Sequence, residues 1–152
     1  MTISRRKFIQ LLTISSTACL TLLTPIRSWA AWASQAFNAN ELETAIHNLF
    51  GSSKLIESKK VTLKIPKTAE NGAAVPITIK TNLPGVESIS IFVKDNPFPL
   101  TASFKIPEGT VASISTRIRL AQSSTVTAVI KIGDKLYSQS QEVNVTIGGC
   151  GS

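Results

Sequence analysis

The sequence predicts an all-β fold, a sandwich of about seven strands preceded by one helix and followed by a short glycine-rich tail. From Lys59 onward, apolar and polar residues alternate with a period of two, as in strands that bury one face. Gly, Pro and Asn signals interrupt this alternation at short intervals, which is typical of an antiparallel sandwich. The segment before these strands has a different pattern, which we take first.

The N-terminus carries the features of an export signal. Arg5 and Arg6 form a twin-arginine pair, and the apolar stretch Ile9–Leu23 that follows is diluted by Thr and Ser. A membrane span needs about 20 apolar residues, so this stretch is short for a permanent anchor, although an anchor is the alternative. Ala31-Trp32-Ala33 is a small-x-small cleavage site. We therefore expect residues 1–33 to be a twin-arginine signal peptide. The mature chain would then lie in a bacterial periplasm, with no stable membrane association.

Removal of this segment changes the charge balance. Four of the 16 basic residues lie in residues 1–33 and none of the nine acids does, so the net charge falls from +7 to +3 (twelve basic against nine acidic residues). The remaining lysines form no basic run, which argues against nucleic acid binding. The mature chain is long enough for one core.

Residues 34–57 are predicted to be a helical segment. Asn40 is the expected N-cap, and Gly51 the expected end of the helix. The apolar residues at helical spacing are Leu42, Ile46, Leu49 and Phe50. His47, the only histidine, falls on the polar side, where it is either an ordinary surface residue or a ligand or general base.

Residues 58–147 are predicted to be an immunoglobulin-like sandwich. The inward rows are Val61/Leu63/Ile65, Val75/Ile77/Ile79, Ile89/Ile91/Val93, Phe104/Ile106, Ile114/Ile118/Leu120, Val126/Ala128/Ile130/Ile132 and Val143/Val145/Ile147. Gly133-Asp134 predicts a two-residue hairpin turn between the last two strands.

This body contains no pattern for catalysis, a metal or a cofactor. One histidine and one remaining cysteine are too few for a metal site, and no glycine-rich phosphate loop occurs. Arg117 and Arg119 could bind an anion or lie on a solvated strand face. Three aromatic residues, Phe92, Phe98 and Tyr137, are either interface residues or packing residues.

The C-terminal Cys150 is the candidate functional residue. Cys19 lies within the signal, where a lipoprotein cysteine is the alternative interpretation, so the mature chain keeps a single cysteine. Exported proteins normally pair their cysteines, and an odd one implies an intermolecular bond or a working thiol. Residues 148–152 form a predicted flexible arm, in which Gly148, Gly149 and Gly151 surround the thiol without bulk. Cys150 is the third residue after Ile147, a reach of roughly 10 Å.

The thiol has no activating neighbour in the sequence. A free cysteine has a pKa of about 8.5, and the last five residues contain no Lys, Arg or His. An enzyme would hold a base within hydrogen-bond reach, whereas a carrier can use the pocket of each partner. The pattern favours a covalent carrier. The alternatives are an exported thiol enzyme of the sulfurtransferase or peroxidase type, and a disulfide-linked structural subunit.

Several segments resemble the SoxY family, the sulfur carriers of periplasmic thiosulfate oxidation. They are Ala69–Ile77, Leu83–Ile89, Asn96–Pro99, Ser115–Arg119, Lys135–Ser138 and the ending Gly148-Gly149-Cys150-Gly151. The family tail usually ends in two glycines after the cysteine, whereas this chain ends in Ser152. Since Ser152 is small and lies beyond Cys150, we expect the chemistry to be unaffected.

The resemblance implies more than the residues do. It implies a heterodimer with SoxZ, attachment of thiosulfate to Cys150 by the SoxAX cytochrome, and release of sulfate by the SoxB hydrolase. The remaining persulfide would pass to the SoxCD sulfane dehydrogenase where one is present. Cofactors and metals would belong to these partners, and the chain itself would be no enzyme.

Overall fold

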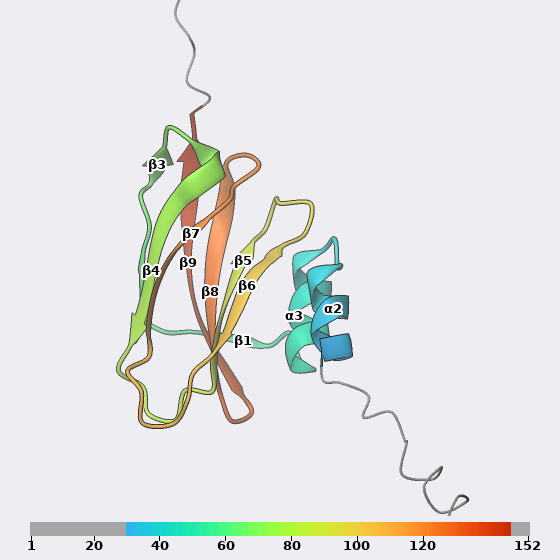
Figure 1. The fold of residues 1–152 in the computed structure, drawn as a ribbon, viewed down its shortest axis with the longest axis vertical. Coiled ribbons are helices and arrows are strands. Elements are labelled where there is room, and N and C mark those ends of the chain that lie inside the picture. Colours follow the sequence, from blue (N-terminus) through green and yellow to red (C-terminus); the bar gives the residue numbers. More distant parts are fainter. Residues whose placement is uncertain (1–29, 147–152) are drawn as a thin grey trace, which may run out of the picture. The chain divides into compact units, whose positions relative to one another are not determined.

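Two β-sheets face each other in the computed structural model, which describes residues 30–146 (Figure 1). The larger sheet has the strand order β1-β9-β8-β5-β6, and β3 also pairs with β9; the smaller has the order β2-β4-β7. The larger sheet contains β1 (Leu55–Glu57), β3 (Thr68–Ala69), β5 (Ser88–Val93), β6 (Leu100–Lys105), β8 (Ser124–Ile132) and β9 (Lys135–Val145). The smaller contains β2 (Val61–Lys64), β4 (Val75–Thr81) and β7 (Ser113–Ile118). The predicted sandwich is confirmed.

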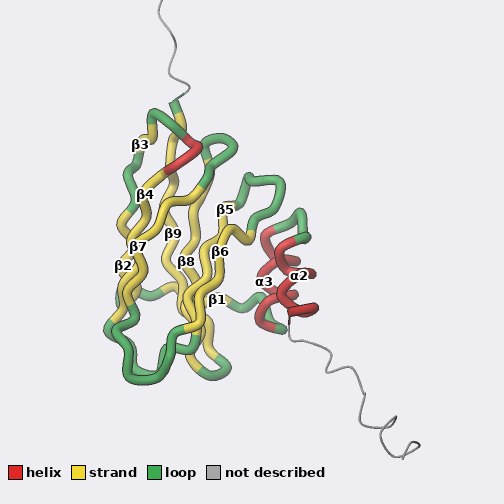
Figure 2. The backbone as a smooth tube through the Cα atoms, viewed as in Figure 1, coloured by secondary structure: helices red, strands yellow, loops and turns green. Residues whose placement is uncertain are grey.

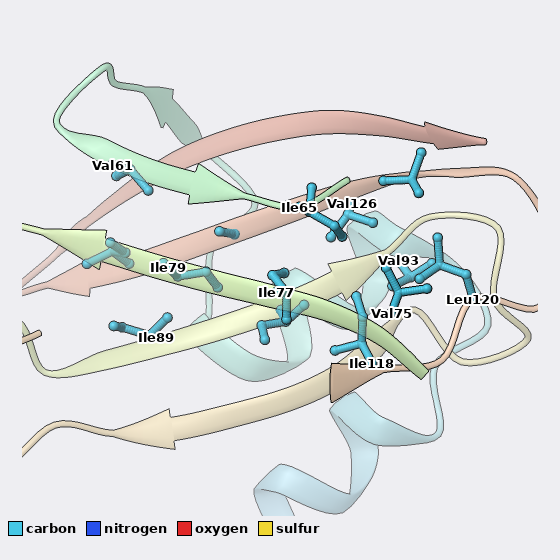
Figure 3. Packing of buried hydrophobic residues seen from close by; sticks show 14 of the residues in the cluster. Val61, Ile65, Val75, Ile77, Ile79, Ile89, Val93, Ile118, Leu120 and Val126 are labelled. Atoms are coloured by element: carbon cyan, nitrogen blue, oxygen red, sulfur yellow. The ribbon is translucent and has the colours of Figure 1, made fainter. Parts of the chain in front are cut away.

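The core lies between the two sheets, where the predicted inward rows meet. Ile77 and Ile79 of β4 face Ile89 and Val126 of the larger sheet, and all four are almost fully buried (Figure 3). Alternate residues such as Thr62, Lys80 and Arg117 are exposed. Period two in the sequence thus becomes one dry face and one wet face on the smaller sheet.

A second apolar cluster covers the outer face of the larger sheet. Two helices, α2 (Ala30–Phe37) and α3 (Leu42–Phe50), supply Ala36, Ala45 and Ile46, and the sheet supplies Phe92, Leu100, Val129 and Leu136. The rings of Phe50 and Phe92 meet in a tilted arrangement, with centroids 6.4 Å apart and an interplanar angle of 55°. The sequence predicted one helix, and α2 is additional. The apolar periodicity predicted for α3 is correct, since this face packs on the sheet. Within residues 30–146, no helix is long and apolar enough to cross a membrane.

The start of α3 differs from the prediction. Glu41, not Asn40, occupies the N-cap position, and its side chain makes no cap hydrogen bond. Gly51 ends the helix as expected, with φ of 75° and its N–H bonded to the carbonyl of His47. Glycine adopts this left-handed conformation without the steric penalty that a Cβ atom would cause.

Two short strands, β1 and β3, were absent from the prediction. Both pair with β9 in parallel, Leu55 opposite Leu136 and Thr68 opposite Asn144, and β2 between them pairs with β4 of the other sheet. Strands of three and two residues are too short to show alternation. One stretch of chain therefore closes one side of the sandwich by contributing to both sheets. The helical segment predicted for residues 34–57 accordingly ends in strand β1.

The turns place three loops at the same end of the sandwich as the end of β9. These are the β3–β4 loop with its 3-10 turn Gly72–Ala74, the β5–β6 loop and the β7–β8 loop (Figure 2). The predicted Gly133-Asp134 hairpin is confirmed, since Ile132 pairs with Lys135, and it lies at the opposite end.

Candidate functional site

The predicted attachment residue Cys150 lies outside the described residues, as do Gly148, Gly149, Gly151, Arg5 and Arg6. What the structure describes is the place from which the C-terminal arm starts. Thr146 is the last described residue, and Cys150 follows four residues later, which at 3.3–3.6 Å per residue is a reach of about 13–14 Å. We call residues 68–73, 119–123 and 144–146 the arm base.

Hydrogen bonds hold the end of β9 from both sides. On one side, the Asn144 N–H donates to the Lys67 carbonyl at 2.8 Å, and the Thr146 N–H donates to the Ala69 carbonyl at 3.0 Å. On the other side, the Val145 N–H donates to the Ser123 hydroxyl at 2.9 Å. These hydrogen bonds hold the chain in position up to Thr146, the residue after the end of β9.

Gly72 joins the remaining parts of the arm base. Its carbonyl accepts the Leu120 N–H at 2.8 Å. A Cβ at this position would collide with the Leu120 carbonyl oxygen and would lie 3.1 Å from Cγ1 of Val145. Only glycine permits this close approach of the two loops and β9. The Asn71 carboxamide oxygen accepts the Ala73 N–H at 2.8 Å and forms the turn that presents Gly72.

A shallow groove of about 300 Å³ runs across the arm base. It is lined by Glu70, Asn71, Gly72, Ala73, Arg119, Leu120, Ala121, Val145 and Thr146. Its ionisable side chains are Glu70 and Arg119, both exposed, one of each sign. The groove has no histidine and no cluster of carboxylates, so it offers no general base of the histidine type to a thiol.

A larger cavity, of about 760 Å³, lies at the opposite end between residues 81–87 and 106–112. Gly85 of this cavity lies near Ile132, and Glu87 accepts the Gly133 N–H, so the cavity adjoins the β8–β9 hairpin. The eleven residues of β9 separate this hairpin from the arm base, roughly 33 Å at the rise of a strand. Since the arm reaches about 14 Å, Cys150 does not reach the larger cavity.

The structure also shows the positions of the other candidate residues predicted from the sequence. His47 is exposed on α3, and Arg117 and Arg119 are exposed on the face opposite the buried Ile118, as expected for solvated positions. Phe92 and Tyr137 are packing residues, whereas Phe98 is 53% exposed. Among residues 30–146, no three His, Cys, Asp or Glu side chains gather as a metal site would require.

Two residues of the site were missed as such in the sequence. Gly72 and Asn96 both belong to turn signals and to the family-like segments Ala69–Ile77 and Asn96–Pro99, but neither was predicted as a site residue. In the structure, hydrogen bonds of both residues hold the arm base together. Their signal was the pairing of Asn with Gly or Pro. That pattern predicts a turn but does not say which loop the turn will contact.

Comparison with known proteins adds the family. The family model described as "Sulfur oxidation protein SoxY" matches residues 46–150, more than half of the chain and including the sandwich. The chain belongs to the SoxY family. The matched range ends at position 150, so it covers Gly148, Gly149 and Cys150 of this chain.

A solved structure of the same family supports this assignment. The sulfur carrier protein SoxY from Chlorobium limicola f thiosulfatophilum is 41% identical, with a TM-score of 0.64. The alignment covers 70% of this chain and 97% of that one. The resemblance to the SoxY family seen in the sequence is therefore confirmed.

The other comparisons give a weak structural similarity and no curated relative. A chain from a structural study of T cell specificity and activation by toxic shock syndrome toxin-1 aligns at 11% identity and a TM-score of 0.42. It covers 57% of this chain and 99% of its own length, a likeness too weak to interpret. The search of curated proteins finds no match.

Proposed function

We propose that this chain is the sulfur carrier of a thiosulfate-oxidising Sox system and that it holds the sulfur covalently on Cys150. Family membership is the observation that carries the proposal, because the matched region extends to Cys150. The SoxY structure that it resembles at 41% identity is described as a sulfur carrier. The arm base adds physical support, since it holds the chain firmly at a point from which a thiol four residues away can extend into another protein.

The proposed loading step is an oxidation. A bond forms between the Cys150 sulfur and the outer sulfur of thiosulfate, the thiol proton goes to solvent, and two electrons leave to the haem centres of a SoxAX-type cytochrome. Water then attacks the terminal sulfonate group in a SoxB-type hydrolase. The bond between sulfur and the sulfonate group breaks, sulfate and two protons leave, and a persulfide anion remains on Cys150 for a SoxCD-type sulfane dehydrogenase or another acceptor.

The division of labour follows from what the chain itself offers. The thiolate is the reactive form of cysteine, and a thiol without a neighbouring cation or base is mostly protonated at neutral pH. The groove at the arm base presents Glu70 and Arg119, and these exposed charges of opposite sign provide little net activation. We propose that the chain supplies the attachment atom and the reach, and that each partner supplies activation, metal or haem. The tether also keeps the reactive intermediate at high local concentration.

We further propose a heterodimer with SoxZ. Within residues 30–146, β6 has a strand neighbour on one side only, and so have β2 and β7. Open strand edges with unpaired backbone groups invite pairing unless a partner covers them. A stable heterodimer would bury on the order of 1,200–2,000 Å² or more in total.

Export is part of the same proposal. The twin-arginine route accepts folded cargo, so the heterodimer could cross on the signal of this chain alone. Replacing Arg5 and Arg6 by lysine would then leave both subunits in the cytoplasm, although only one was altered. Fractionation with antibodies against each subunit tests this. If the partner reaches the periplasm while this chain does not, the two proteins assemble after export.

Intact-mass measurement tests the carrier function directly. Periplasmic protein from cells that grow on thiosulfate is expected to show added sulfur and sulfonate masses, which a reductant removes. The Cys150→Ser variant is expected to show the unmodified mass alone. A cross-linking subunit would show a reducible dimer without adducts, and a thiol enzyme would turn over substrate without partners. Either of these results contradicts the proposal.

A further inference from the structure

One exposed aromatic ring lies on a loop at the arm end of the sandwich. Phe98 belongs to the β5–β6 loop, residues 94–99, and has Pro97 and Pro99 as its neighbours. It is 53% exposed, whereas Pro99 beside it is fully buried. Burial of a Phe side chain is worth about 1.5–3 kcal/mol. Phe98 is the most exposed aromatic side chain described in residues 34–146, so a partner that covers it would gain apolar burial.

This exposure is not due to a loose loop, because the backbone on both sides of Phe98 is held. The Val93 N–H donates to the Pro99 carbonyl at 2.8 Å, and the Lys94 N–H donates to the Thr125 carbonyl at 3.0 Å. The Asp95 N–H donates to the Ser124 hydroxyl at 3.0 Å. The prolines fix φ at two of the remaining positions. The ring is presented by a rigid support, and little conformational entropy is lost if a partner covers it.

The Asn96 side chain ties this loop to the arm base. Its amide nitrogen donates to the Arg119 carbonyl at 2.8 Å, and its oxygen accepts the Ala121 N–H at 2.9 Å. The intervening Leu120 donates to Gly72, and the nearby Ser123 accepts from Val145, as described above. Loop 94–99 therefore belongs to the same hydrogen-bonded assembly as the root of the arm. Figure 1 shows the β5–β6 loop, the β7–β8 loop and the end of β9 at one end of the sandwich.

The length of the arm decides what must approach this end. Cys150 extends no more than about 14 Å beyond Thr146. Any enzyme whose buried reaction centre receives the adduct must therefore bring the mouth of its channel against the arm base and the loops fastened to it. Whatever covers the arm base during reaction also meets loop 94–99.

We propose that Phe98 is the docking anchor for the enzymes that act on the sulfur adduct of Cys150. This inference rests on the proposed carrier function. Aromatic residues near the centre of an interface are those that most often dominate binding energy. A single preorganised ring, with the exposed cations Lys94 and Arg119 on the adjoining surface, fits a small contact of the weak, transient class. Such a contact suits a carrier that must leave each enzyme after reaction.

Steady-state kinetics with the reconstituted oxidising enzymes and the complete heterodimer test the proposal. In Phe98→Ala, the KM for the carrier is expected to rise about tenfold, which corresponds to 1.4 kcal/mol. The kcat should remain near wild type, since the chemistry at Cys150 is unchanged. Phe98→Leu, which keeps apolar bulk, should give an intermediate KM. The matched control is Val111→Ala at the opposite end, where the side chain is 84% exposed, and its KM should equal that of wild type.

Three results would overturn the inference. The first is an unchanged KM in Phe98→Ala, and the second is an equal rise in Val111→Ala. The third is loss of the heterodimer from Phe98→Ala in size-exclusion chromatography, which would assign the ring to the stable subunit interface instead. Failure of the carrier function is distinguishable, because wild-type protein would then form no adduct on Cys150 at all. If Phe98→Ala forms the adduct normally and shows normal kinetics, the carrier function is supported and the role of Phe98 as a docking anchor is refuted.

Discussion

The two ends of the sandwich are built differently. At the arm end, the Asn96 side chain ties loop 94–99 to the β7–β8 loop, and the Ser123 hydroxyl ties the β7–β8 loop to β9. The surface there is only a shallow groove. At the opposite end, glycines with positive φ, Gly85, Gly109 and Gly133, turn the loops around a cavity more than twice as large. Polar links occur there too: the Thr81 hydroxyl donates to the Lys60 carbonyl at 3.0 Å, and the Glu87 carboxylate bonds to Lys131 and to the Gly133 N–H.

This difference shows that the larger cavity need not be the functional site. Pockets are the usual starting hypothesis for a ligand site, but a carrier keeps its substrate on a tether and needs a firm origin for that tether. For the proposed carrier function, the important properties are the rigidity of the arm base and the length of the arm beyond it. The predictions below compare the two ends, in order of decreasing effect.

The largest effect is expected at Cys150. Cys150→Ser should reduce thiosulfate-dependent turnover to background, because the hydroxyl cannot form the sulfur–sulfur bond. The melting temperature should not change, since the neighbouring Gly148, Gly149, Gly151 and Ser152 offer no apolar side chain to bury this residue. Reconstituted oxidation assays and thermal melts measure both. A matched change at the opposite end, Val111→Ser, should leave turnover intact. Turnover at the wild-type rate in the cysteine variant would refute the carrier.

The next effect concerns the freedom of the arm. Replacing Gly148 and Gly149 by valine adds branched side chains that restrict φ and ψ and widen the arm. We expect delivery to every partner to slow between about tenfold and a hundredfold, as for a misplaced reacting group. The double alanine variant should fall between valine and wild type. Single-turnover kinetics with each partner provide the measurement, and equal rates for all three proteins would show that the arm does not enter narrow channels.

A smaller effect is expected from Gly72 at the arm base. Gly72→Ala places a methyl group against the Leu120 carbonyl oxygen and should cost about 1–3 kcal/mol of stability, as overpacking does. Because the displaced loops hold Val145 and Thr146, delivery from Cys150 should also slow. Denaturant unfolding and partner kinetics together measure this. Ala73→Ser, at the exposed neighbouring position, is the control. If Gly72→Ala has the stability of wild type, then the loops that contain Gly72 and Leu120 can move apart without loss of folding free energy, and this prediction is wrong.

The smallest effect is expected from Glu87 at the opposite end. The hydrogen bond from Lys131, and next that from the Gly133 N–H, lower the pKa of this carboxyl below its ordinary value of 4.5. A lowered pKa in the folded state means that the stabilisation is complete above the ordinary value and is lost as the pH falls through the lowered one. Wild type should therefore exceed Glu87→Gln slightly in melting temperature at pH 7.

This small advantage should disappear in acid and diminish with added salt, since the pair is exposed. Thermal melts of both proteins between pH 7 and pH 3 measure it. Delivery from Cys150 should be equal in the two proteins at pH 7, because Glu87 lies a strand's length from the arm base. A difference in delivery without a difference in stability would contradict the separation of the two ends.

Much of the fold follows from the sequence, because burial and alternation are local. Ile77 and Ile79 are inward and Lys80 is outward in the structure, as the period of two requires. The Gly133-Asp134 hairpin and the apolar face of α3 are equally local and were predicted correctly. The prediction failed at β1 and β3, whose few residues form strands only because β9 offers them a partner edge far along the chain.

The candidate site divides in the same way. By itself, the sequence predicted Cys150 as the attachment residue and residues 148–152 as the arm, because an unpaired cysteine among glycines is a feature of composition that needs no fold. It also carried the segments by which the SoxY family was identified. Only the tertiary structure decided what stands around the root of that arm. Gly72, Asn96 and Ser123 lie far apart in the chain, and Phe98 lies five residues after the end of β5, a strand whose sequence resembles that of its neighbours. They meet because strand pairing brings three loops to the end of β9, and hydrogen bonds between such distant residues leave no periodic trace in the sequence.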